Sequence, residues 1–374
     1  MASSRSRRMR SGGGQRFLPR LALALLSPTR AMSTVLPGRF VVATNGVASA
    51  SELTSKEFLL SHPPGAYTTA RTCARAARLF EWTTHVERTA ASAAAMINDQ
   101  AGSAAPAPSA RSSLLASIGN APSLRPKLDA TVSAAVRQYC STYGREDELK
   151  VTILVTWPSA TSGAAACEGS TEGSPAAERS LASAEGSPAA EGSVACHIAP
   201  LPPLPKPPVK VEVRGAPRAN AAAKDSSWVA DRAPLEALKR EDVNELLLAG
   251  EGGELLEGSQ TNFFTLEKGC LRTAGEGILA GTVRRLLLEV CEAEGIPVIL
   301  SPPRLDDAAT WEAAFISSTS RLLLPIDELY LPKDGKQSEP ADLVRTFDNT
   351  AGSLSAKLRD LVQSEVEAHS TEIA

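Results

Sequence analysis

The sequence has few of the residues that build disulfide frameworks, metal sites and membrane spans. Only 4% of its 374 residues are aromatic, and its six cysteines are scattered without a Cys-x-x-Cys pair. Neither a disulfide framework nor a zinc site is predicted, and a reduced compartment is expected. The four histidines lie far apart and form no pair with metal-ligand spacing. The apolar run from Leu21 to Leu26 is far shorter than the roughly 20 residues that cross a bilayer.

Acidic residues are absent before Glu52, whereas eight arginines fall within residues 1–40. This composition is typical of a transit peptide, so we exclude residues 1–37 from the fold and expect a mitochondrial or plastid location. A secretory signal and a plain basic tail are the alternatives, and with a plain tail the protein would be cytoplasmic. The net charge of the whole chain is −3, so no global basic field favours a nucleic-acid partner.

The remaining chain is long enough for two domains that mix strands and helices. Residues 38–157 show strand patterns, then helical patterns, and end in a strong strand. Residues 158–208 are rich in Ala, Ser, Gly and Glu and then in Pro, and a motif that begins at Glu172 recurs from Glu185. We expect a disordered insert that ends in a polyproline spacer, with a ligand for proline-binding domains as the alternative. Residues 209–374 again mix strands and helices, around a core of their own.

Several catalytic signatures are missing from the chain. It has no Gly-x-Ser-x-Gly elbow, no dinucleotide fingerprint and no complete phosphate-binding P-loop. What it does have is a lysine, Lys224, that follows an Ala-rich run and precedes Asp-Ser-Ser. A lysine acts as a Schiff-base nucleophile only where burial or a nearby positive charge depresses its pKa; otherwise it is an ordinary solvated side chain.

Three further positions carry groups that suit a phosphate or a protonated ring. Glu257 ends an apolar strand before a Gly-Ser turn, where it would either keep a pyridinium nitrogen protonated or cap a backbone amide. Residues 279–284 run from a loop into a helix start, which favours phosphate binding with Thr282 as a donor, or simple capping by Thr282. Arg88 would give a phosphate a fixed positive charge, although alone it resembles any surface arginine.

In order and spacing, these residues resemble the fold-type IV (class IV) pyridoxal-phosphate enzymes. That family includes branched-chain aminotransferases, D-amino-acid aminotransferases and aminodeoxychorismate lyases, and aminotransferase-like plant proteins look most similar. The family signature is Glu-x-x-x-x-Asn-aromatic, a Thr-containing strand, and Gly-x-x-Arg at a helix start. It stands here as Glu257, Asn262-Phe263-Phe264, Thr273 and Gly281-Thr282-Val283-Arg284. The resemblance covers most of residues 38–157 and 209–360.

The resemblance implies a two-domain α/β (α+β) fold of the D-amino-acid aminotransferase type, with pyridoxal 5′-phosphate as cofactor. Lys224 would hold the cofactor as a Schiff base, and Glu257 would pair with its pyridine nitrogen. Tyr67, with Thr69 beside it, would face the substrate. The phosphate would be anchored by Arg88, Thr282, Val283 and Thr319.

The resemblance also implies transamination between an amino acid and a 2-oxo acid, by a homodimer. Two alternatives stay open: a lyase of the aminodeoxychorismate type, which releases pyruvate without an acceptor, and a non-catalytic scaffold. The amino-terminal domain departs from the family pattern. Thr68 replaces the usual acidic residue, and the arginine and histidine that hold the α-carboxylate in D-amino-acid aminotransferases have no clear counterpart. The preferred amino acid and its stereochemistry are therefore not predicted.

Overall fold

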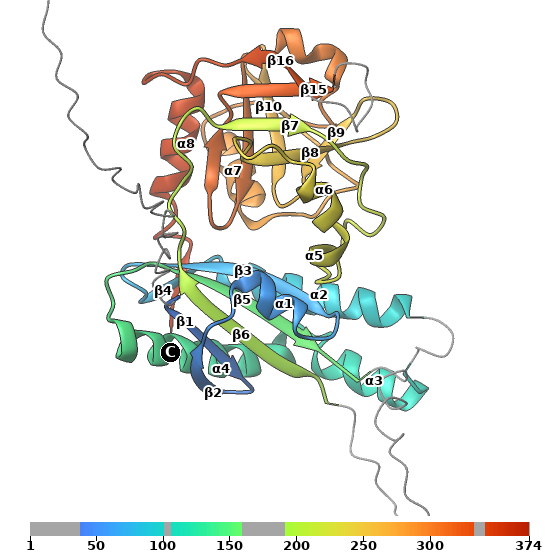
Figure 1. Cartoon of the computed structure of the whole chain (residues 1–374), viewed down its shortest axis with the longest axis vertical. Helices are drawn as coiled ribbons and strands as arrows, with labels where there is room; N and C mark the ends of the chain where they lie inside the picture. Colours follow the sequence, from blue (N-terminus) through green and yellow to red (C-terminus); the bar gives the residue numbers. More distant parts are fainter. Residues whose placement is uncertain (1–37, 101–105, 159–190, 333–340, 374) are drawn as a thin grey trace, which may run out of the picture. The chain divides into compact units, whose positions relative to one another are not determined.

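The computed structural model describes residues 38–100, 106–158, 191–332 and 341–373 (Figure 1). This part of the chain forms two β-sheets, each with its own helices. The predicted transit peptide, residues 1–37, and the repeats that begin at Glu172 and Glu185 lie outside the described residues. Within the described ranges, no helix combines the length and the apolar character that a membrane crossing requires.

The first sheet has seven strands, and every neighbouring pair is antiparallel. In spatial order they are β17 (Ser370–Glu372), β4 (Arg78–Phe80), β3 (Ala66–Cys73), β5 (Leu149–Thr156), β6 (Ser193–Pro200), β1 (Phe40–Thr44) and β2 (Val47–Ser51). Its helices are α1 (Ser55–Leu60), α2 (Trp82–Asp99), α3 (Pro108–Ser117) and α4 (Ala121–Tyr143).

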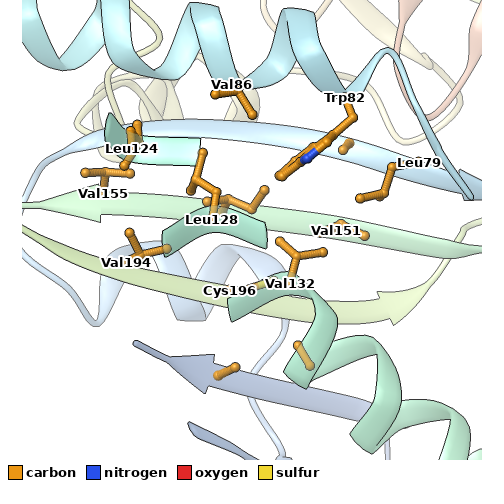
Figure 2. Close-up of a cluster of buried hydrophobic side chains, with 14 of the residues drawn as sticks. Leu79, Trp82, Val86, Leu124, Leu128, Val132, Val151, Val155, Val194 and Cys196 are labelled. Carbon is orange, nitrogen blue, oxygen red and sulfur yellow. The ribbon is translucent and has the colours of Figure 1, made fainter. Parts of the chain in front are cut away.

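Helices α2 and α4 supply an apolar cover for one face of this sheet. Figure 2 shows side chains from both helices, such as Val86 and Leu128, against Val151 and Val155 of β5 and Val194 of β6. Successive strand residues point to opposite faces, so β3 and β5 present their other side chains away from this core. That second face carries the polar residues that line the cavity described below.

The prediction of one disordered insert over residues 158–208 is wrong for β6. Its residues Val194, Cys196 and Ile198 are buried in the core. The strand pairs along its whole length with β5 and over Ala195–Ile198 with β1. The alternating apolar pattern starts right after the low-complexity stretch, whose composition concealed it. The prediction that residues 209–374 form one separate domain also fails at the carboxyl end. There β17 pairs with β4 of the first sheet.

The second sheet has ten strands and contains three parallel pairs, β7 with β8, β7 with β15, and β11 with β12. Its main path is β12 (Val298–Leu300), β11 (Cys270–Thr273), β10 (Asn262–Glu267), β9 (Leu255–Gly258), β8 (Glu245–Ala249), β7 (Lys210–Val213), β15 (Glu328–Pro332) and β16 (Ala341–Thr346). Off this path, β13 (Ala313–Ser318) pairs with β10 and with β14 (Leu322–Pro325).

The helices of this half are α5 (Trp228–Asp231), α6 (Ala233–Ala237), α7 (Thr282–Ala293) and α8 (Leu354–Ser364), with a 3₁₀ helix over Leu305–Thr310. Helix α7 has an apolar stripe with helical spacing, and Val283, Leu286 and Leu287 pack against Phe264 and Phe315 of the sheet. This packing fixes the direction of α7, and with it the position of its first turn.

Candidate active site

One cavity of about 350 Å³ is lined by all eight residues that the sequence predicts for the site. This volume lies in the range of small-ligand and cofactor sites. On one side, its walls come from β3, β5 and α2. On the other side, they come from the loops and helix starts in the half of the chain that forms the second sheet. The eight predicted site residues among them are Tyr67, Thr69, Arg88, Lys224, Glu257, Thr282, Val283 and Thr319.

Lys224 lies in a segment that backbone hydrogen bonds attach to the start of β3. The Tyr67 amide donates to the Lys224 carbonyl at 2.9 Å, and the Ser226 amide donates to the Gly65 carbonyl at 2.9 Å. The Lys224 amide itself donates to the Ser92 hydroxyl of α2 at 3.0 Å. Contacts on both sides of the lysine therefore fix its backbone and aim its side chain into the cavity.

The side chain of Lys224 sits in surroundings that favour its neutral form. Its Nζ lies 4.4 Å from the centroid of the Tyr67 ring. Burial lowers the pKa of Lys224 below its ordinary value, Arg88 and Arg218 lower it further, and Tyr67 acts in the opposite sense. A depressed pKa is the condition under which a lysine becomes a nucleophile, so the solvated-lysine alternative does not describe this side chain.

Arg88 is a partly buried arginine of α2 whose side chain lines the cavity, not an exposed surface residue. Its Nη2 donates to the Thr68 hydroxyl at 2.7 Å, while its buried Nε has no hydrogen-bond partner among the described residues. Burial lowers the pKa of Arg88 to about 10, so the guanidinium remains charged at neutral pH. Thr68, the departure from the family pattern, thus orients this arginine.

The start of α7 supplies the second half of an anion site. Gly281 is the residue that precedes the helix, and Thr282 is its first residue, so the alternative of Thr282 as the cap is wrong. The Thr282 and Thr319 hydroxyls lie 3.1 Å apart, and both line the cavity. The first amides of a helix have no intrahelical acceptor and carry a partial positive charge, which favours a phosphate at this point.

Glu257 lies on β9, is only 3% exposed, and has both carboxylate oxygens engaged. Its Oε1 accepts from Arg218 Nε at 2.8 Å, and its Oε2 accepts from the Leu279 amide at 3.0 Å. Burial raises the pKa of Glu257, while Arg218 and the Leu279 amide lower it. The carboxylate is thus buried, oriented and next to a fixed cation.

Five basic residues that were not predicted from the sequence line the same cavity: Lys56, Lys150, Arg218, Arg232 and Arg321. Arg218 is the most directly involved, because it pairs with Glu257 and its guanidinium lies 5.6 Å from the Trp228 ring centroid. Its place six residues before Lys224 was the only available signal. An isolated basic residue in a sequence does not reveal where its side chain points, and the fold alone brings these five together.

Comparison with known protein families agrees with this site. The model of the family described as "Amino-transferase class IV" matches residues 65–329, which is well over half of the chain. The chain belongs to this family. Its membership confirms the predicted family, and the predicted cofactor of that family, pyridoxal 5′-phosphate.

Solved structures of this fold align over nearly the whole of their length. A branched-chain aminotransferase from Thermoproteus uzoniensis, solved with norvaline, is 19% identical, with a TM-score of 0.59 over 89% of this chain and 99% of that one. A PLP-bound "hypothetical aminotransferase" from Mycobacterium tuberculosis is 16% identical, with a TM-score of 0.57 over 88% of this chain and 99% of that one. The predicted fold class is therefore confirmed.

A curated relative resembles one part of the sequence. The Methanocaldococcus jannaschii protein named "Putative branched-chain-amino-acid aminotransferase" is 32% identical over 89 residues. These residues make up 23% of this chain and 31% of the relative, so the match spans less than a third of the relative's length.

Proposed function

We propose that the protein is an aminotransferase that uses pyridoxal 5′-phosphate to move an amino group between an amino acid and a 2-oxo acid. The observation that carries this proposal is the cavity itself. It brings a lysine of depressed pKa, a charged arginine, a helix start and a buried carboxylate together in one space, and the arginine and the helix start both suit the phosphate. The lysine and the carboxylate each suit a different part of the cofactor.

The residues present fit the cofactor, as the unsatisfied polar atoms in the cavity wall indicate. The buried Nε of Arg88 and the buried hydroxyl of Ser317 have no hydrogen-bond partner among the described residues. A buried polar atom without a partner is costly, and a bound phosphate would provide acceptors for donors of this kind. The phosphate would thus be held by Arg88, by the Thr282 and Thr319 hydroxyls, and by the first amides of α7, including that of Val283.

When bound, pyridoxal phosphate supplies an aldehyde that condenses with amines and a ring that accepts electrons from the substrate. Lys224 would bind the aldehyde carbon through its free amine and, once released, would carry a proton at Nζ to and from the substrate. Glu257 would accept a hydrogen bond from the ring nitrogen and hold its positive charge. Arg218 would keep Glu257 ionised and in place, since it lowers the pKa of that carboxyl.

The buried charges favour this function over the non-catalytic scaffold. Burying ionised side chains costs free energy, and a scaffold would gain nothing from cations directed into a cavity. The lyase alternative would use the same lysine. It is distinguished by its product, because a lyase releases pyruvate when no 2-oxo acid is supplied.

The proposal is tested on the purified protein loaded with the cofactor. We expect an absorbance band near the short-wavelength edge of the visible range. Borohydride should abolish this band and link the cofactor irreversibly to Lys224. Peptide mass mapping then locates the adduct. An adduct on another lysine, or none at all, would sink the proposal. Amino-group transfer to added 2-oxo acids, followed with a panel of D- and L-amino acids, separates the aminotransferase from the lyase.

Gly281 offers a structural test of the phosphate site. A Cβ at this position would lie 2.1 Å from Asn262 Oδ1, and Asn262 in turn donates to the Leu279 carbonyl at 2.7 Å. We expect Gly281→Ala to displace the start of α7 and weaken cofactor binding about 10-fold, a typical consequence of overpacking. The control is Gly250→Ala, whose nearest neighbour is the flexible end of Glu254. Equal cofactor affinity in both variants would contradict this role of Gly281.

The oligomeric state and the location of the protein form part of the same proposal. We propose that the protein is a homodimer, as the family resemblance implies, and that residues 1–37 direct it to a mitochondrion or plastid. The arginine-rich composition of those residues supports the second point.

A further inference from the structure

The cavity contains more positive charge than the cofactor requires. Besides Arg88 and Lys224, five basic side chains line it: Lys56, Lys150, Arg218, Arg232 and Arg321. Four of these five have a carboxylate partner. Arg218 pairs with Glu257, Arg321 pairs with Glu245, and both Arg232 and Lys56 pair with Glu236. Lys150 alone among the five makes no hydrogen bond or ion pair to an acidic side chain in the described residues.

Strand register places Lys150 on the face of the first sheet that forms the cavity wall. Lys150 and Thr152 of β5 lie opposite Arg71 and Thr69 of β3. Their neighbour Val151 points the other way, into the core that α4 covers (Figure 2). Side chains alternate along a strand, so the ammonium of Lys150 shares the cavity face with the hydroxyls of Thr69 and Thr152.

The surroundings of Lys150 are positive. Burial lowers the pKa of Lys150, and the nearby Arg232 and Arg321 lower it further, while Tyr67 raises it. Tyr67, Lys224 and Arg232 line the same cavity as Lys150. The Thr152 hydroxyl is buried and has no hydrogen-bond partner among the described residues. An ammonium, a guanidinium and an unsatisfied hydroxyl therefore line the space beside the reactive lysine.

We propose that Lys150 is a specificity-determining residue whose ammonium, together with Arg232, binds the carboxylate of the amino-acid or 2-oxo-acid substrate. This inference rests on the proposed aminotransferase function. In an amino acid, the amino nitrogen and the carboxylate are held on one carbon. Lys224, where the amino group would react, lines the same cavity as Lys150 and Arg232, where the carboxylate would bind. These cations would take the place of the arginine and histidine that bind the α-carboxylate in D-amino-acid aminotransferases and have no clear counterpart in this sequence.

The test compares binding of a carboxylate with binding of its neutral isostere. Cofactor-loaded protein is titrated in a calorimeter with 4-methylpentanoate and with 4-methylpentanamide. We expect wild-type protein to prefer the carboxylate by between about 10- and 100-fold, the range expected for charge-assisted hydrogen bonds. Lys150→Met should lose this preference without weakening the binding of the amide. Lys150→Arg should retain it, since it keeps the charge.

The matched control is Lys127→Met on α4, a helix that covers the opposite face of the sheet. It should bind both probes as the wild type does. Absence of a carboxylate preference in wild-type protein, or equal weakening for both probes in Lys150→Met, would overturn the inference. If Lys150→Met does not fold, Lys150→Gln serves in its place. Failure of the aminotransferase proposal is recognised separately, because it would appear in wild-type protein as no borohydride adduct on Lys224.

Discussion

Replacing Lys224 by alanine is expected to lower the transamination turnover number by at least about 10⁴-fold. Proton transfer by a positioned side chain alone contributes up to about that factor. The variant also loses the amine that bonds the cofactor. The groups around Lys224 do not offer an amine in its place: its Nζ lies 4.4 Å from the Tyr67 ring centroid, and Arg88 and Arg218 carry guanidinium groups. The measurement is steady-state amino-group transfer with the best donor of the panel.

A matched control for this variant is Lys357→Ala on α8, which removes an exposed ion pair with Glu294. It should keep both the absorbance band and the activity. Retained turnover in Lys224→Ala would disprove the assigned role. The wild-type protein should also show a pH signature. The pKa of Lys224 is lowered, so the rate of cofactor uptake should rise with pH and level off below the ordinary lysine value of 10.5.

Glu257→Gln is expected to lower the turnover number by about 10²–10³-fold, the range for losing one preorganised electrostatic stabiliser. Glutamine keeps the size of the side chain but removes its negative charge, so the ring nitrogen loses its anionic partner. Arg218, which donates to Glu257 at 2.8 Å, would then be a buried cation facing a neutral amide. We expect substrate binding to change far less than turnover, because the lost interaction acts on charge that develops during the reaction.

The neighbouring Glu254→Gln provides the control, since Glu254 pairs with Arg304 and does not line the cavity. Its turnover should match that of the wild type. A second variant, Arg218→Met, removes the cation that lowers the pKa of Glu257. The pKa of that carboxyl should rise further, so turnover should fall as the pH is lowered through it. Turnover that is unchanged in Glu257→Gln would exclude Glu257 as the partner of the ring nitrogen.

The site was largely predictable from sequence because its residues follow a fixed order along consecutive elements. Glu257 on β9, Thr282 at the start of α7 and Thr319 after β13 each stand where a strand ends or a helix begins. Local patterns of apolar residues and glycines reveal such ends. The strand β6 was missed for the opposite reason, since it directly follows a low-complexity stretch that hides where it begins. Its partners β1 and β5 decide its structure.

The sequence by itself determined the family and its cofactor, and it predicted the residues that line the cavity, since these depend on residue types at fixed spacings. Only the tertiary structure decided which side chains join them. Arg218, Lys150 and Arg232 come from a loop, from a strand of the first sheet and from the end of α5. They meet only when the two sheets fold around the cavity. The free energy of a buried charge depends on all its neighbours, and those neighbours are distant in the chain.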